Sequence, residues 1–259
     1  MMAGHFGLKT LQILRKVFFK HMAESPKITN SDKLNTEQFP TWCPGCGDFG
    51  IWIALKNAVS EMGWQPDDFL VVYGIGCSGN MSSFVKSYGF HGLHGRALPV
   101  AMGAKLANPK LKIIVIGGDG DGYGEGGNHF LHTLRSNIDI TYLVHDNQVY
   151  GLTKGQMAPT TEHGQITSST PEGALEQAFN PPAIAIAGGG TFVAQGFSGD
   201  TRQLTQLIKD AVAHPGFSHI NVLQPCVTFN HHNTFSWFYQ RVYKLETVNH
   251  DFSNRLAAM

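Results

Sequence analysis

The sequence is poor in charged residues, and its charges balance. Lys and Arg number 19 of the 259 residues and Asp and Glu another 19, so 15% of the chain is charged and the formal net charge is zero. Soluble domains average about 25% charged residues. Without a basic excess there is no electrostatic basis for binding nucleic acid or an anionic membrane surface, and both are excluded as partners. We interpret the low charge as a sign that a partner protein covers part of the surface.

Long apolar runs are also missing. A bilayer span needs about 18 consecutive apolar residues, whereas the N-terminal stretch LQILRKVFF is interrupted by Arg15 and Lys16. That interruption is atypical of a secretory signal, so we expect a cytoplasmic chain that starts either at Met1 or at Met22. We interpret residues 1–34 as an extension outside the fold and residues 35–259 as one domain, long enough to bury a sizeable core.

Cysteines are few, and each lies beside turn residues. The four are Cys43 and Cys46 in CPGCG, Cys77 in GIGCSG and Cys226 in QPCVTF. A structural disulfide is not expected in a reducing compartment, so the C-x-x-C pair indicates a redox dithiol, half of a zinc site or half of an iron–sulfur site. Zinc sites usually combine two close pairs, whereas an iron–sulfur cluster requires four thiolates without that spacing.

Strands and helices alternate along the rest of the chain. Apolar runs that end at turn residues predict strands over 68–76, 110–120, 138–147 and 219–226. Apolar residues at helical spacing predict helices over 51–63, 96–109, 127–137 and 201–216. This alternation predicts an α/β fold, with an open, mostly parallel sheet and helices on both faces. Ligands in such sheets bind beyond the carboxyl ends of strands, where GIGCSG, GGDGDG and HDNQVYG occur.

The loop GGDGDGYGEGG (117–127) joins a predicted strand to a predicted helix. Gly122, Gly124 and Gly127 satisfy the dinucleotide pattern G-x-G-x-x-G, which is weak on its own. Asp119 and Asp121 precede these glycines, and their carboxylates would repel a bare phosphate. The loop therefore favours a phosphate ligand bridged by a divalent cation.

A third oxygen ligand follows the next strand. Asn147 lies 28 residues after Asp119, and one helix and one strand between them bring both to the same edge of the sheet. Mg²⁺ prefers oxygen ligands such as a carboxylate, a side-chain amide oxygen and a backbone carbonyl, with ligand phosphates completing the octahedron. Backbone N–H groups of the glycine-rich turn would support a diphosphate.

The G-D-G sequence followed by this Asn resembles the thiamine diphosphate signature. WCPGCGDFG, GIGCSG, HGLHGRALPVAMGAKLANP, the GDGDG loop with its Asn and QPCVTFN together resemble the beta subunit of the 2-oxoacid:ferredoxin oxidoreductases over roughly residues 35–245. The resemblance implies the pyrophosphate-binding fold of thiamine diphosphate enzymes. It also implies three cofactors, namely thiamine diphosphate, Mg²⁺ and one [4Fe–4S] cluster.

The resemblance assigns these cofactors to particular residues. It implies that Mg²⁺ is held by Asp119, Asn147 and the carbonyl of Val149. It places the cofactor against Ile75, Gly76, Cys77, Ser78 and His94, with the diphosphate on Gly120, Asp121, Gly151 and Leu152. It assigns the cluster to Cys43, Cys46, Cys77 and Cys226. His94 is the one catalytic candidate, and Asp146 stands where the family usually has Asn.

By resemblance, the reaction is the oxidative decarboxylation of a 2-oxoacid with coenzyme A. The products are an acyl-CoA and CO₂, and electrons pass through the cluster to ferredoxin. An alpha subunit supplies the rest of the active site, in a heterodimer or an α2β2 assembly. A distal carboxylate, as in 2-oxoglutarate, would call for a cation such as Lys86 or Arg96, and pyruvate stays open. The alternatives are a non-oxidative thiamine-dependent decarboxylase or synthase and a nucleotide-binding module with a structural metal site.

Overall fold

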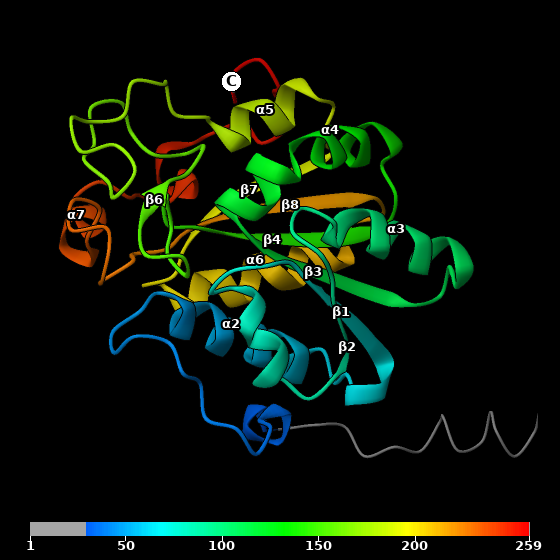
Figure 1. The fold of residues 1–259 in the computed structure, drawn as a ribbon. Helices are drawn as coiled ribbons and strands as arrows, with labels where there is room; N and C mark the ends of the chain where they lie inside the picture. The colour runs from blue at the N-terminus through cyan, green and yellow to red at the C-terminus, as the bar shows by residue number, and fades with distance from the viewer. Residues whose placement is uncertain (1–29, 259) are drawn as a thin grey trace, which may run out of the picture.

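A six-stranded sheet organises the computed structural model, which describes residues 30–258 (Figure 1). The strand order is β2-β1-β3-β4-β8-β7, and every neighbouring pair is parallel. The strands are β1 (Phe69–Tyr73), β2 (Tyr88–His91), β3 (Lys112–Gly118), β4 (Ile140–Asp146), β7 (Phe192–Phe197) and β8 (Phe217–Leu223). A short antiparallel pair, β5 (Val149–Tyr150) and β6 (Gln156–Met157), lies outside this sheet.

Helices cover both faces of the sheet, as Figure 1 shows. One face carries α2 (Asp48–Glu61) and α6 (Thr201–Ala213), and the other carries α3 (Ala97–Ala107), α4 (Gly127–Ser136) and α5 (Pro181–Ala187). The short helix α7 (Phe235–Tyr239) packs its Phe238 against Phe197 at the end of β7. The predicted α/β class is therefore confirmed. Within residues 30–258 no helix has both the length and the apolar character needed to cross a bilayer.

The strand order reverses between β1 and β3. The chain runs from β1 outward to β2 on one side, and from β3 through β4 to β8 on the other. The loops that leave the carboxyl ends of β1 and β3 therefore diverge and leave a crevice, the usual ligand position in an open parallel sheet. After β3 the chain enters a π-helical turn, η4 (Gly120–Glu125), which leads into α4.

The predicted strands and helices are present. Most are slightly shorter than the sequence pattern indicated, whereas α2 begins three residues before its predicted start. The elements that were not predicted include the edge strand β2, the short pair β5 and β6, the strand β7 and the short helices α5 and α7. All of β2 is exposed, so it carries no buried apolar run. The predicted boundary at residue 34 stays a prediction, since residues 1–29 lie outside the described part. The 3₁₀ helix Ser31–Leu34 does pack on the domain, with Leu34 fully buried in the core.

Two glycines inside helices predict opposite effects on stability. A Cβ on Gly50 of α2 would lie 2.0 Å from the carbonyl oxygen of Ser198, whereas one on Gly103 of α3 would meet nothing within 4 Å. Alanine is favoured over glycine in helices by about 1 kcal/mol, but a backbone clash forces a shift that costs about 1–3 kcal/mol. We expect Gly50→Ala to lower the free energy of unfolding and Gly103→Ala to raise it, as measured by urea denaturation. A Gly50→Ala protein as stable as the parent would contradict this packing.

Candidate functional site

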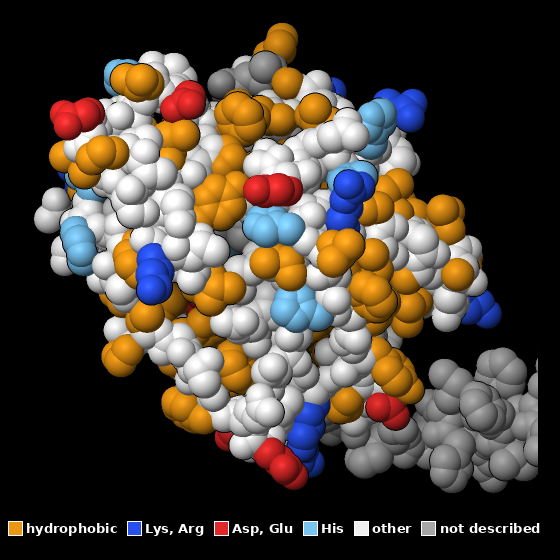
Figure 2. All heavy atoms as spheres, in the orientation of Figure 1, with side chains coloured by type: hydrophobic (Ala, Val, Ile, Leu, Met, Phe, Trp, Pro, Cys, Tyr) orange, Lys and Arg blue, Asp and Glu red, His pale blue; other side chains and the backbone are white. Residues whose placement is uncertain are grey.

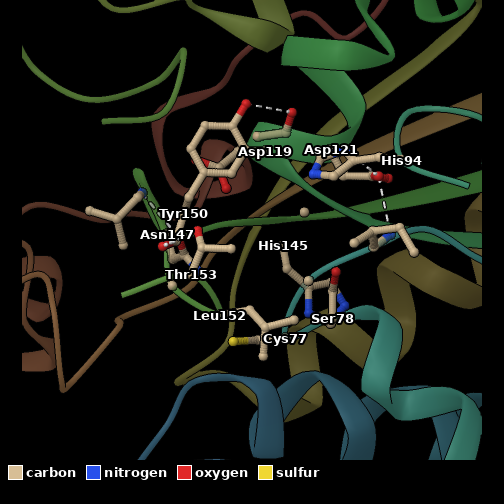
Figure 3. Close-up of a pocket in the computed structure, with 16 residues that line it drawn as sticks. Cys77, Ser78, His94, Asp119, Asp121, His145, Asn147, Tyr150, Leu152 and Thr153 are labelled. Atoms are coloured by element: carbon tan, nitrogen blue, oxygen red, sulfur yellow. Dashed lines mark hydrogen bonds and ion pairs between the residues drawn. The ribbon is translucent and has the colours of Figure 1, made fainter. Parts of the chain in front are cut away.

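A pocket opens at the crevice where the strand order reverses (Figure 3). Its wall comes from three loops, residues 75–78 after β1, residues 118–121 after β3 and residues 145–153 around the end of β4, with His94 added from the loop after β2. The walls include all of the residues to which the resemblance assigned cofactor or Mg²⁺ contacts. Their function as ligands stays a prediction, but the fold brings them together.

Asp119 and Asn147 lie on neighbouring loops of this wall. The Oδ2 of Asp119 accepts hydrogen bonds from the Thr160 hydroxyl at 2.6 Å and the Gln148 backbone N–H at 3.0 Å. The Oδ1 of Asn147 accepts from the backbone N–H of Val149 at 3.1 Å, which fixes the turn into β5. These bonds orient a carboxylate and an amide at one edge of the sheet, so the predicted oxygen ligands adjoin the same pocket.

Burial makes Asp119 a strong candidate for cation binding. Burial first, and the nearby Asp146 carboxylate second, raise the pKa of Asp119 to about 8. The Oδ2 of Asp146 accepts a 2.9 Å hydrogen bond from Asn221, and its Oδ1 has no hydrogen-bond partner. Asp146, whose effect the sequence left open, thus adds a second carboxyl group beside Asp119 and a second negative charge where both are ionised, although burial raises the pKa of Asp146 as well. A divalent cation would neutralise this charge, so the residues present fit Mg²⁺.

Close packing explains the glycine at position 120. A Cβ there would lie 2.3 Å from Cε1 of Tyr150, whose hydroxyl donates to the Gly120 carbonyl at 3.2 Å and to Glu125 at 3.0 Å. The ring of Tyr150 therefore lies directly over the start of the π-helical turn. Gly120 and Tyr150 both line the pocket, and any larger residue at position 120 would clash with this ring.

The second aspartate of the loop holds other loops in place. The Oδ1 of Asp121 accepts from the backbone N–H of Ile75 at 3.1 Å and of Gly95 at 2.8 Å. It also pairs with Nδ1 of His94 at 3.1 Å, and that nitrogen lies 3.3 Å from Glu125. The predicted contact between Asp121 and a diphosphate stays a prediction. In the structure its carboxylate joins the loops after β1 and β2 to the π-helical turn, which positions His94 at the pocket.

A buried His–Asp pair adjoins the pocket, which His145 lines. Nδ1 of His145 lies 2.6 Å from Oδ1 of Asp48, and both side chains are 1% exposed. Nε2 of His145 has no hydrogen-bond partner, and neither does the buried hydroxyl of Ser78. Both residues line the pocket (Figure 3). Buried polar atoms without partners are rare in folded proteins, so these two indicate that a polar ligand completes the site.

The four cysteines converge beside this pocket. A Cβ on Gly151 would lie 3.5 Å from the sulfur of Cys77 and 3.7 Å from that of Cys226. Burial, followed by Asp48, Cys226 and Cys43, raises the pKa of Cys77 to about 12. Burial and then Asp48, with Cys226 contributing last, also raise the pKa of Cys46. The fold thus brings Cys46 and Cys226, 180 positions apart, close enough to interact electrostatically. All four cysteines are free thiols.

The four free cysteines supply the thiolate donors that a [4Fe–4S] cluster requires. Across the described range 30–258, no three His, Cys, Asp or Glu side chains come close enough together to hold one metal ion. A cubane cluster carries its four thiolates on outer corners, so its ligands stand farther apart than those of one zinc ion. Iron would also stabilise the thiolates that burial and mutual repulsion disfavour.

Sequence patterns missed several residues of this site. Asp48 and His145 are 97 positions apart and Gln224 and Cys46 are 178 apart, so no spacing rule could pair them. Thr160, which donates to Asp119, lies in the stretch GLTKGQMAPTT that contributed to the family resemblance, but no role was assigned to it. The only available signal was adjacency, because Asp48 follows the C-x-x-C pair and His145 precedes the Asp-Asn pair.

Comparison with protein families agrees with this geometry. Residues 74–222 match the model of the C-terminal thiamine pyrophosphate-binding domain of thiamine pyrophosphate enzymes. Residues 226–259 match the C-terminal part of the pyruvate ferredoxin oxidoreductase beta subunit. The first match spans β3, β4 and β8 and their connecting loops, so it includes the Asp119–Asn147 edge and Cys77.

Individual relatives identify the kind of thiamine pyrophosphate enzyme that this chain is most similar to. The beta subunit of 2-oxoacid:ferredoxin oxidoreductase 2 from Aeropyrum pernix is 49% identical over 211 residues, 82% of this chain and 68% of that protein. The 2-oxoglutarate oxidoreductase subunit KorB from Mycobacterium tuberculosis is 42% identical over 195 residues, 75% of this chain and 52% of that protein.

A solved structure indicates the same family as these relatives. The 2-oxoglutarate:ferredoxin oxidoreductase from Magnetococcus marinus, solved with 2-oxoglutarate, coenzyme A and succinyl-CoA bound, superposes with a TM-score of 0.83 and 40% identity. The match covers 87% of this chain and 77% of that one. The family model, the relatives and the solved structure therefore agree with the pocket at the strand-order reversal. This chain belongs to the beta subunits of the 2-oxoacid:ferredoxin oxidoreductases.

Proposed function

We propose that this chain binds Mg²⁺–thiamine diphosphate and one [4Fe–4S] cluster and carries out the oxidative, coenzyme A-dependent decarboxylation of a 2-oxoacid with an alpha subunit. Electrons leave through the cluster to ferredoxin. The observation that carries the proposal is the position of Cys77. It lines the pocket and lies beside Cys226, within electrostatic reach of Cys43. A cluster on these sulfurs would adjoin the thiamine site. This position favours oxidation of the decarboxylated substrate by the cluster over its simple protonation.

The chain's own residues have distinct tasks in this proposal. Asp119, Asn147 and the Val149 carbonyl would hold Mg²⁺, with Thr160 orienting Asp119. The open backbone at Gly120 would receive the diphosphate. When bound, thiamine diphosphate supplies the electron sink for the loss of CO₂. Ser78 and His145 offer unpartnered polar atoms to the bound molecules.

A partner subunit is required to complete the site. Apolar side chains cover much of the face seen in Figure 2, with few charges between them. The exposed apolar side chains of the described residues include Leu93 in the loop after β2, Leu152 in the pocket wall, and Ile166, Leu175 and Phe179 in the long loop after β6. Exposed apolar patches usually mark protein interfaces. We infer that the alpha subunit covers this edge and excludes water from the pocket.

The substrate is proposed only as a 2-oxoacid. None of the residues that line the pocket is Lys or Arg, and Arg96 instead contacts His129 at 3.0 Å. A distal carboxylate would need a cation to bind it, so the selectivity for 2-oxoglutarate over pyruvate would come from the alpha subunit. The names of the relatives make 2-oxoglutarate the first compound to try.

One reconstitution experiment tests the whole proposal. The chain is purified without oxygen together with its alpha subunit, and each of 2-oxoglutarate, pyruvate and a branched 2-oxoacid is added with coenzyme A and a one-electron acceptor dye. We expect acyl-CoA, CO₂ and dye reduction for at least one substrate. CO₂ release together with an aldehyde, and without dye reduction, would support the non-oxidative decarboxylase instead. Absence of thiamine diphosphate binding would support the nucleotide-binding alternative.

The affinity for Mg²⁺–thiamine diphosphate is expected to rise with pH. Burial and the Asp146 charge raise the pKa of Asp119 to about 8, so below that pH the cation must displace a proton. The affinity should therefore increase about tenfold per pH unit between pH 6 and 8 and then level off. Calorimetric titrations across this range measure it. Equal affinities at pH 6 and 8 would contradict a role for Asp119 as the ionised ligand.

A further inference from the structure

Cys46 differs from the other three cysteines in its surroundings. Its sulfur lies 3.3 Å from Nε2 of Gln224 and 3.4 Å from Oδ2 of Asp48. Among residues 30–258, side-chain hydrogen bonds to a cysteine sulfur are found at Cys46, whereas Cys226 accepts from the backbone of residues 228–230. One of the four sulfurs is therefore held between an amide donor and a carboxylate.

The amide of Gln224 is fixed in orientation. Its Nε2 also donates to the carbonyl of Pro225 at 3.1 Å, and the side chain is 1% exposed. The end of the Gln224 side chain that faces the Cys46 sulfur and the Pro225 carbonyl is the NH₂ group, because both neighbours are acceptors and a carbonyl oxygen could bond to neither. The backbone of Gln224 is held in turn, since its N–H donates to the Asp146 carbonyl at 2.9 Å. The donor therefore points at the Cys46 sulfur without the freedom of an exposed side chain.

The carboxylate of Asp48 is fixed as firmly. Asp48 begins helix α2, is fully buried, and gives its other oxygen to His145 at 2.6 Å. Once Cys46 binds iron and loses its proton, the carboxylate remains against the sulfur. Its charge then opposes any electron added nearby.

We propose that Gln224 and Asp48 shift the reduction potential of the cluster in opposite directions, each through its contact with the sulfur of Cys46. Hydrogen bonds to cluster sulfurs and local charge are among the main determinants of iron–sulfur potentials. The Gln224 amide stabilises the more negative, reduced cluster and raises its potential. The Asp48 carboxylate destabilises it and lowers the potential. The inference rests on the proposed cluster, and both residues act through Cys46 as positioning residues.

A redox titration of the assembled protein tests this. The full chain is co-purified anaerobically with its alpha subunit, iron is counted, and the reduced cluster is followed by electron paramagnetic resonance. We expect Gln224→Met, similar in size but without a donor, to lower the potential, and Asp48→Asn to raise it. Each change should alter the ratio of reduced to oxidised cluster about tenfold at a fixed applied potential, or about 59 mV for one electron. The double variant should lie between them.

A matched glutamine serves as control. Gln206 lies on the exposed face of α6 and bonds to Asp210 at 2.8 Å, so Gln206→Met should leave the potential unchanged. If Gln224→Met loses iron, Gln224→Glu keeps the shape and should lower the potential further. Variants that keep about four irons per chain with an unshifted potential would overturn this inference alone. A parent protein without iron would instead overturn the proposed function, and this inference with it.

Discussion

Replacement of Asp119 by alanine is expected to abolish measurable Mg²⁺-dependent binding of thiamine diphosphate. Asp119 is a buried carboxylate of the pocket wall, to which Asn147 also belongs, and the proposed metal bridge joins it to the diphosphate. Loss of a residue that merely orients a metal ligand costs about 10–100-fold in affinity. Loss of the ligand itself should therefore exceed about 100-fold. Calorimetric titration of thiamine diphosphate with and without Mg²⁺ measures the change.

Two further variants make this result specific. Thr160→Val removes the hydroxyl that donates to Asp119 at 2.6 Å but keeps the carboxylate, so its loss should be intermediate, about tenfold. Asp210→Ala removes an exposed carboxylate of α6 and should leave the affinity unchanged. Circular dichroism checks that all three proteins fold. An Asp119→Ala protein with the affinity of the parent would disprove the metal bridge at this edge.

The second large effect is expected from Cys77→Ser. A serine hydroxyl is a poor iron ligand beside three thiolates, and Cys77 lies where the pocket meets the other cysteines. We expect the iron content to fall from about four atoms per chain, with loss of the brown colour of the parent protein. Electron transfer to an acceptor dye should fall to background. Iron analysis and visible absorption on anaerobically purified protein measure this.

The neighbouring residue provides the control. Ser78 occupies the same turn and also lines the pocket, but its hydroxyl is not a predicted cluster ligand. Ser78→Ala should therefore keep its iron, so that a loss seen only in Cys77→Ser is due to the sulfur and not to a disturbed turn. A Cys77→Ser protein that retains four irons would show that the cluster has other ligands. Zinc in place of iron in the parent would favour the non-oxidative alternative.

Both predictions depend on how the two sites share one loop. Cys77 and Ser78 are consecutive, and the first adjoins the cysteines while the second faces the pocket with His145. The pair His145–Asp48 runs beneath this loop and ends at Cys46. The proposed cluster ligand Cys46 and the pocket residue His145 are therefore joined through Asp48, by contacts between largely buried side chains.

The sequence alone predicted the parts of this protein that depend on local order. Strands β1, β3, β4 and β8 are apolar runs bounded by turn residues, and such periodicity is a short-range property of the chain. The edge strand β2 and the short helix α5 were not predicted, because neither has a long buried face that would give an apolar pattern. The Asp119–Asn147 spacing was readable for a similar reason. One βα unit has a nearly constant length, so it returns the chain to the same edge of the sheet.

Tertiary structure alone decided which side chains meet across the sheet. The contacts of Gln224 with Cys46, of His145 with Asp48 and of Asp121 with the loops after β1 and β2 join segments 26 to 178 residues apart. They depend on strand register, on the helix that packs above and on the rotamer of each side chain. Nothing in the local pattern of the chain records these. The sequence therefore predicted the ligands of the site, whereas only the fold determined the charges and hydrogen bonds that act on them.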